Sequence, residues 1–168
     1  MKTIFRIILL AFIIRISFSI MACNNNKNQE KMTTENTTPL FPKGEKLTNG
    51  YFTGDAYLKT LLSKDKNNDF VLGSVTFEPG ARTNWHTHPK GQVLIVTEGE
   101  GLYQEKGKTA QVIKKGDVIN IPENLEHWHG ATGRTKMVHI AITNYEGETN
   151  AVWLNPVTDE EFNAANKN

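Results

Sequence analysis

Two histidines separated by one residue, with a glutamine close behind, are the side chains of this sequence best suited to hold a metal ion. They occur in NWHTHPKGQ, residues 84–92. Side chains two residues apart in a β-strand point to the same face, so His86 and His88 would converge on one point. A turn at residues 89–91 would bring Gln92 back on a neighbouring strand. This geometry predicts a metal site; the alternative is a pair of ordinary surface histidines.

The other three histidines extend the pattern. His127 and His129, in EHWHG, share a strand face from which Trp128 points away. His139 lies in the alternating stretch KMVHIAIT. Beside a bound dication, a histidine has a lowered pKa, so it is neutral at pH 7 and can accept a proton. His129 and His139 are therefore candidate catalytic bases; the alternative is that they are structural histidines of the core.

The elements that must position these residues are β-strands. Residues 40–62 predict a leading strand followed by a short helical or irregular piece. At the other end, Thr158 and Glu161 form a capping-box pattern that predicts a short C-terminal helix, with Val157 and Phe162 as its hydrophobic staple. Between them, short strands at regular spacing indicate an all-β sandwich or barrel. The predicted strands lie in FVLGSVTFEPG (70–80), QVLIVTEGEG (92–101), GLYQEKGK (101–108), AQVIKKGD (110–117), VINIPEN (118–124), EHWHGA (126–131) and KMVHIAITN (136–144).

The histidine spacing extends into a two-part pattern that resembles the signature of the cupin family, over residues 70–143. Gln92 stands where the family usually has glutamate, Asn124 replaces a glycine and Ala131 replaces a final asparagine. The resemblance implies a double-stranded β-helix, the cupin jelly-roll barrel, and a divalent transition metal bound by His86, His88, Gln92 and His127. The positions that carry it are Gly80, His86, His88, Gln92, Gly99, Gly116, Pro122, Asn124 and His127.

Within the cupins, ARTNWHTHPKGQVLIVTEGEG and KKGDVINIPENLEHWHGAT are similar to small single-domain members that include manganese-dependent hydroxynitrile lyases. That resemblance implies three histidines and one glutamine around Mn, and pocket histidines at His129 and His139. Imidazole and oxygen ligands also suit Fe, Ni, Co or Zn. Two alternatives stay open: an Fe or Ni dioxygenase of the quercetinase type, and a non-catalytic binding cupin associated with carboxymuconolactone decarboxylase-like proteins. The candidate pocket wall is Val75, Phe77, Leu94, Val96, Trp128, Met137 and Thr143.

Other positions beyond the histidines are assigned structural roles. Glu98, Glu100 and Glu105 are expected at solvated strand and turn positions, and Tyr103 is expected to pack at the end of the barrel.

The N-terminus predicts export. Residues 1–22 resemble a bacterial lipoprotein signal, with Lys2 and Arg6 before an apolar run and Cys23 as the lipid-anchored first residue. Residues 23–39 would form a flexible tether, residues 40–157 the cupin domain, and residues 158–168 the C-terminal helix and tail. The alternative is translation from Met21, which would leave a cytoplasmic protein.

The charge balance and the exposed strand edges indicate which partners to expect. With 19 basic and 18 acidic residues, the charge balance gives no reason to expect a nucleic-acid partner. We expect a small-molecule substrate, a membrane contact only through the lipid on Cys23, and a homodimer that covers exposed strand edges.

Overall fold

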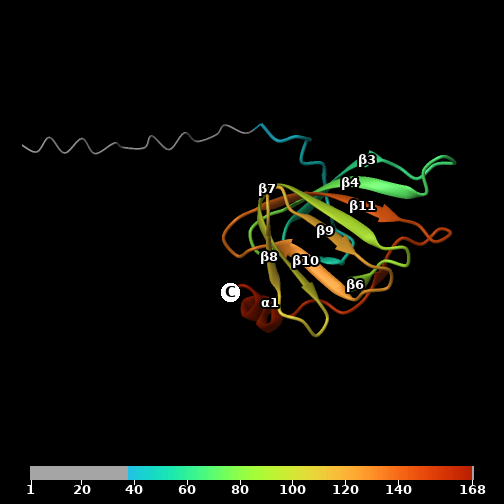
Figure 1. Cartoon of the computed structure of the whole chain (residues 1–168). Coiled ribbons are helices and arrows are strands. Elements are labelled where there is room, and N and C mark those ends of the chain that lie inside the picture. Colours follow the sequence, from blue (N-terminus) through green and yellow to red (C-terminus); the bar gives the residue numbers. More distant parts are fainter. Residues whose placement is uncertain (1–37, 168) are drawn as a thin grey trace, which may run out of the picture. The chain divides into compact units, whose positions relative to one another are not determined.

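The computed structural model describes residues 38–167, which form twelve β-strands and one short α-helix (Figure 1). The predicted signal sequence, Cys23 and nearly all of the predicted tether lie outside the described residues. Within residues 38–167, no helix has both the length and the apolar character needed to cross a membrane. The elements are β1 (Glu45–Lys46), β2 (Phe52–Thr53), β3 (Ala56–Leu62), β4 (Phe70–Phe77), β5 (Arg82–Thr83), β6 (His86–Thr87), β7 (Gln92–Glu105), β8 (Gln111–Lys114), β9 (Val118–Ile121), β10 (His127–Ala131), β11 (Met137–Asn144), β12 (Val152–Trp153) and α1 (Asp159–Ala165).

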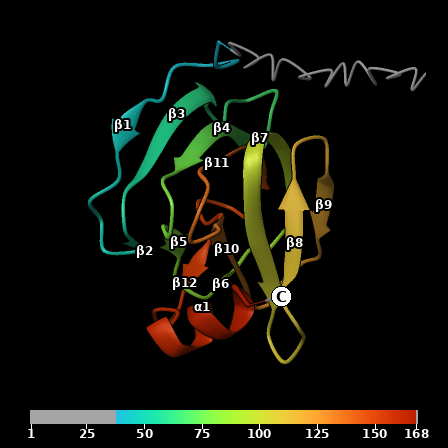
Figure 2. The same cartoon turned by 90° about the vertical axis from the view of Figure 1, so that its left-hand side faces the viewer.

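The strands wrap into a curled antiparallel sheet, which is the predicted double-stranded β-helix (Figure 2). Its main path runs β1-β3-β4-β11-β7-β10-β5-β2. One edge of the 14-residue strand β7 is taken first by β11 and then by β10, and the other edge first by β9 and then by β8. Strands β10 and β11, which carry three of the histidines, are thus successive neighbours of one bent strand.

The prediction of a short helical or irregular piece at the end of residues 40–62 is wrong. Residues 56–62, AYLKTLL, form strand β3, which pairs with β4 on one side and β1 on the other. Alanine, leucine and lysine favour helices only by fractions of a kcal/mol, whereas pairing satisfies the backbone groups along β4. The edge of the sheet therefore decides the local structure here.

The prediction of two strands over residues 92–108 is also wrong, because β7 continues through its glycines. Gly99 adopts a φ of +70°, and a Cβ at this position would lie 2.0 Å from the carbonyl oxygen of Lys136. Only glycine fits this conformation and this close approach. The glycine bends the strand without ending its pairing, since β11 still lies opposite Gly99.

A β-bulge next to this bend changes which residues of β7 point into the barrel. The register shifts between Val138 and His139, which lie opposite Glu98 and Val96, so β7 carries one extra residue. Before the bulge the buried inward residues have even numbers, with Leu94 as an example. After it, Tyr103 belongs to the same interior cluster.

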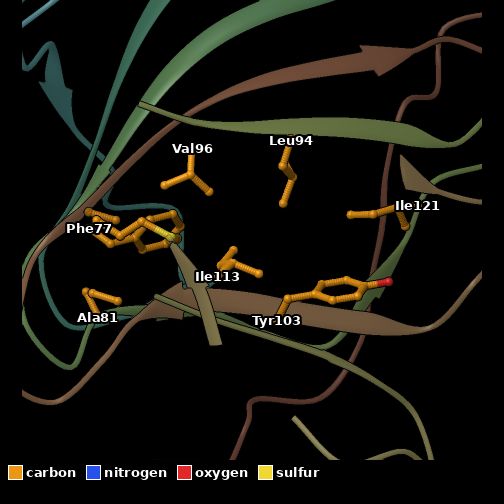
Figure 3. Packing of buried hydrophobic residues seen from close by; sticks show 10 residues of the cluster. Phe77, Ala81, Leu94, Val96, Tyr103, Ile113 and Ile121 are labelled. Atoms are coloured by element: carbon orange, nitrogen blue, oxygen red, sulfur yellow. The ribbon is translucent and has the colours of Figure 1, made fainter. Parts of the chain in front are cut away.

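Two apolar clusters stabilise the barrel. The inner cluster fills the barrel from within, as Figure 3 shows. The outer cluster lies between β10 and α1, where the Trp128 and Phe162 rings are 6.1 Å apart. Trp128 therefore does not line the interior, and its inclusion in the pocket wall was wrong; its indole Nε1 donates to Gln104 on the outer face at 2.9 Å. The inner cluster is Ala56, Phe77, Ala81, Leu94, Val96, Tyr103, Ile113, Ile121, Ala131 and Met137; the outer cluster is Trp85, Leu102, Trp128, Val157, Phe162 and Ala165.

The C-terminal helix closes the outer cluster and begins as predicted. Thr158 is the N-cap, with its side chain accepting from the Glu161 backbone N–H at 3.1 Å and the Glu161 carboxylate accepting from the Thr158 N–H at 2.9 Å. Val157 and Phe162, the predicted staple, are both buried in the outer cluster. The helix is thereby fixed against the back of β10, the strand that carries His127 and His129.

Candidate metal centre

The six predicted site residues come together inside the barrel. His86 belongs to β6, His88 follows it, Gln92 begins β7, and the remaining histidines lie on β10 and β11. His127 is the cross-strand partner of His86, as the antiparallel pairing of β10 and β6 requires. The six side chains have exposed fractions of 1% (His86), 3% (His88), 6% (Gln92), 0% (His127), 4% (His129) and 0% (His139), so the site lies in the interior.

The imidazole rings form a compact group. The ring centroids of His86 and His127 are 4.2 Å apart, and His88 lies 4.9 Å from His86 and 5.4 Å from His127. His129 lies 5.4 Å from His86 and 5.9 Å from His127. The His139 ring lies 5.0 Å from that of His129. The two candidate bases, His129 and His139, therefore continue the group of histidines that could bind a metal.

Backbone carbonyls determine which nitrogen three of these rings present to the interior. The Nδ1 atoms of His86, His88 and His127 lie 2.9, 2.6 and 2.8 Å from the carbonyl oxygens of Asn84, Asn150 and Leu125. Because a carbonyl can only accept, Nδ1 carries the proton in each ring and Nε2 keeps its lone pair. This is the arrangement that orients and strengthens metal-binding imidazoles in proteins.

Gln92 is oriented in the same way. Its amide nitrogen donates to the hydroxyl oxygen of Thr143 at 2.8 Å, which leaves the amide oxygen buried without a hydrogen-bond partner. Thr143 lies directly opposite Gln92 on β11, so the sheet register creates this contact. Three imidazole nitrogens and one amide oxygen can thus be presented together.

His129 competes with His88 for the role of third nitrogen. One nitrogen from each of His86, His127 and His129 lies within 4.8 Å of the other two, which makes these three a possible metal-binding group. Neither ring nitrogen of His129 has a hydrogen-bond partner, however, so no neighbour fixes its tautomer. The distances between ring nitrogens favour His129, whereas the ring-centroid distances and the carbonyl contacts favour His88.

Unpartnered polar atoms concentrate at this site. Among the described residues, the buried side-chain atoms without a hydrogen-bond partner are Nε2 of His88 and His127, Oε1 of Gln92, the Tyr103 hydroxyl, and both ring nitrogens of His129 and His139. Each such atom costs about 1–3 kcal/mol when left unsatisfied. Together that cost is comparable with the whole stability of a domain, about 5–15 kcal/mol. The donor set therefore fits a bound cation with polar ligands around it.

Burial also determines the charge state of the histidines. Desolvation lowers the pKa of His127 and of His139 to about 4, and it lowers the pKa of His88 as well. The pKa values of His86 and His129 fall well below the usual range, first because of burial and then because of neighbouring histidines. Neutral imidazoles are the form that binds metals and accepts protons.

Sequence comparison agrees with this geometry. The cupin domain family matches residues 73–143. A relative, the (R)-mandelonitrile lyase of Granulicella tundricola, is 43% identical over 112 residues, covering 67% of this chain and 86% of that protein. The chain belongs to the cupin superfamily. A cupin-like protein from Thermotoga maritima, known as a crystal structure, is 47% identical with a TM-score of 0.72, covering 76% of this chain and 97% of that one. An acireductone dioxygenase from Alcanivorax borkumensis is 34% identical over 62 residues, covering 35% of this chain and 34% of that protein.

Some residues at the cupin site were not anticipated from the sequence. The carbonyl of Asn150 fixes His88, and the Trp153 ring stacks on His86 at 4.8 Å. Asn150 and Trp153 lie after residues 70–143, the region that carries the cupin signature. Every residue type has a backbone carbonyl, so the contact of Asn150 cannot be predicted from the sequence. Tyr103 enters the interior through the bulge in β7. Glu105, expected in solvent, is partly buried, with a side chain 18% exposed and paired with Lys108.

Proposed function

We propose that this cupin is a divalent-metal-dependent carbon–carbon lyase that cleaves small cyanohydrins, with His86, His88, Gln92 and His127 as the metal ligands. The observation that carries the proposal is the set of three imidazoles whose Nδ1 atoms are tied to backbone carbonyls. The Nε2 atoms of His88 and His127 and the amide oxygen of Gln92 are buried without a hydrogen-bond partner. The 43% identity to an (R)-mandelonitrile lyase supports the reaction class.

The neutral glutamine has a chemical consequence. A carboxylate at position 92 would cancel part of the charge of a dication, whereas the Gln92 amide leaves that charge whole. A bound dication would act as a Lewis acid toward an oxygen of the substrate. Oxygen and imidazole donors together admit Mn as well as Fe, Co, Ni and Zn, and we propose Mn as the resident ion.

His129 and His139 supply the base in this proposal. Both are neutral at pH 7, and His129 lies between His139 and the proposed ligands. His129 accepts the proton of the cyanohydrin hydroxyl as the carbonyl forms. The carbon–carbon bond breaks with its electron pair leaving on cyanide, which then takes the proton from the imidazolium. The products are an aldehyde or ketone and hydrogen cyanide.

The reaction is tested with purified protein, a panel of aliphatic and aromatic cyanohydrins including mandelonitrile, and detection of both products. We expect turnover that requires metal and falls by about 10²- to 10⁴-fold in His129→Ala, the usual contribution of a general base, with metal content unchanged. Metal-loaded protein that releases no cyanide from any cyanohydrin would refute the proposal. Oxygen consumption with enol or catechol substrates would instead identify a dioxygenase, the class suggested by the shorter acireductone dioxygenase match.

A further inference from the structure

Tyr103 is a buried hydroxyl beside the proposed metal site that the mechanism above does not use. Its side chain is 2% exposed, and its hydroxyl has no hydrogen-bond partner. Its ring centroid lies 5.9 Å from that of His127, and it is the cross-strand partner of His129. The bulge in β7 places this residue on the inner face, where strict alternation from Gln92 would have placed Leu102.

The direction of the hydroxyl links it to the metal ligands. Figure 3 shows the Tyr103 hydroxyl at the Ile121 end of the inner cluster, away from Phe77 and Ala81. Ile121 lies opposite Gln92 in the pairing of β9 with β7. The amide oxygen of Gln92 is likewise buried without a partner. Phe77, in contrast, contacts His129 and His139, with ring centroids 5.8 and 5.6 Å away. The Tyr103 hydroxyl therefore points away from Phe77, the residue that contacts the two candidate bases.

The phenol can donate a hydrogen bond. Burial raises its pKa, and the nearby Glu105 carboxylate adds to the rise through its charge and its ability to accept a hydrogen bond, although no acceptor lies within hydrogen-bond distance of the hydroxyl. Glu105 itself is 2.5 Å from the Lys108 ammonium, which competes for its carboxylate. A neutral hydroxyl in an apolar setting requires an acceptor, and leaving it unmatched costs about 1–3 kcal/mol.

We propose that the Tyr103 hydroxyl donates a hydrogen bond to a small anion held at the metal centre, and that in the proposed reaction this anion is the departing cyanide. This inference rests on the proposed function for the identity of the anion. The phenol keeps its proton throughout: it stabilises the negative charge that develops when the carbon–carbon bond breaks, and the proton of hydrogen cyanide still comes from the imidazolium. Tyr103 thereby favours substrates whose leaving group is a small anion.

The test is Tyr103→Phe, which removes one oxygen atom and no packing, compared with Tyr57→Phe on the outer side of the sheet. Tyr57 is matched because its ring contacts the Lys43 ammonium rather than the interior. The dissociation constants of cyanide and of azide are measured by calorimetry on metal-loaded protein, together with metal content and the melting temperature of metal-free protein.

A hydrogen bond to a charged partner contributes about 1.5–3 kcal/mol, so anion affinity should fall by about 10- to 100-fold in Tyr103→Phe and stay unchanged in Tyr57→Phe. Metal content should be equal in both variants. Equal anion affinity in the two variants overturns the inference, as does wild-type protein that binds neither anion. A lower melting temperature with unchanged affinity also overturns it, because the hydroxyl would then serve Glu105. Anion binding that depends on Tyr103 without cyanohydrin cleavage supports the inference and refutes the lyase.

Discussion

The metal-free protein should lose stability in mild acid because its buried histidines resist protonation. His139 has a pKa of about 4 in the folded protein and about 6.5 when exposed. The pKa in the folded protein is the lower of the two, so burial of the neutral His139 ring leaves the free energy of unfolding at its full value above pH 6.5. This stability is lost as the pH falls from 6.5 toward 4. One pKa unit corresponds to about 1.36 kcal/mol, so this residue alone should remove about 3 kcal/mol of stability.

The perturbation is His139→Gln, which keeps a polar side chain and removes the titration. The free energy of unfolding is measured by urea denaturation of metal-free protein at pH 7 and pH 4. The loss between the two pH values should be about 3 kcal/mol smaller in the variant than in the wild type. Met137→Ala, in the same strand and inner cluster, is the control: it should lower stability at both pH values and leave the difference unchanged.

Equal acid-induced losses in His139→Gln and wild type would refute this reasoning. A direct check is the chemical shift of the His139 ring proton across the same pH range. A midpoint near 6.5 would mean that the interior is accessible to water and that burial does not control the charge of these rings.

Three further changes test separate parts of the structure. Gln92→Glu should bind the metal more tightly and turn over cyanohydrins more slowly, because the added charge weakens the Lewis acid; titration with a competing chelator and initial rates measure the two effects. Phe162→Ala should cost about 3–5 kcal/mol in urea denaturation without changing metal content, since it empties the outer cluster only. Gly99→Ala should prevent folding or lower the melting temperature severely, because its Cβ would meet the Lys136 carbonyl at 2.0 Å and its φ is +70°; circular dichroism measures this.

Local rules in the sequence predicted part of this fold correctly. The capping box of Thr158 and Glu161 is a contact between residues three apart, and it forms as predicted. The i, i+2 spacing of His127 and His129 placed both inside, because a strand has only two faces. Such features depend on neighbours along the chain and can be read without the tertiary structure.

Features that depend on pairing could not be predicted in this way. Tyr103 points inward because a bulge, visible only in the register of β7 with β11, reverses the alternation. Residues 56–62 become a strand because β4 offers them an edge. The carbonyl of Asn150, which orients His88, could belong to any residue type. These cases share one cause: the partner lies far away in sequence and contributes backbone geometry.

The identity of the third nitrogen ligand gives the most direct test of the metal centre. Metal content per chain is measured by elemental analysis for wild type, His88→Ala and His129→Ala after equal exposure to Mn²⁺. We predict one ion per chain in wild type and in His129→Ala, and a large loss in His88→Ala. A loss in His129→Ala with retention in His88→Ala would contradict the ligand set, and wild-type protein without a bound ion would contradict the metal centre itself.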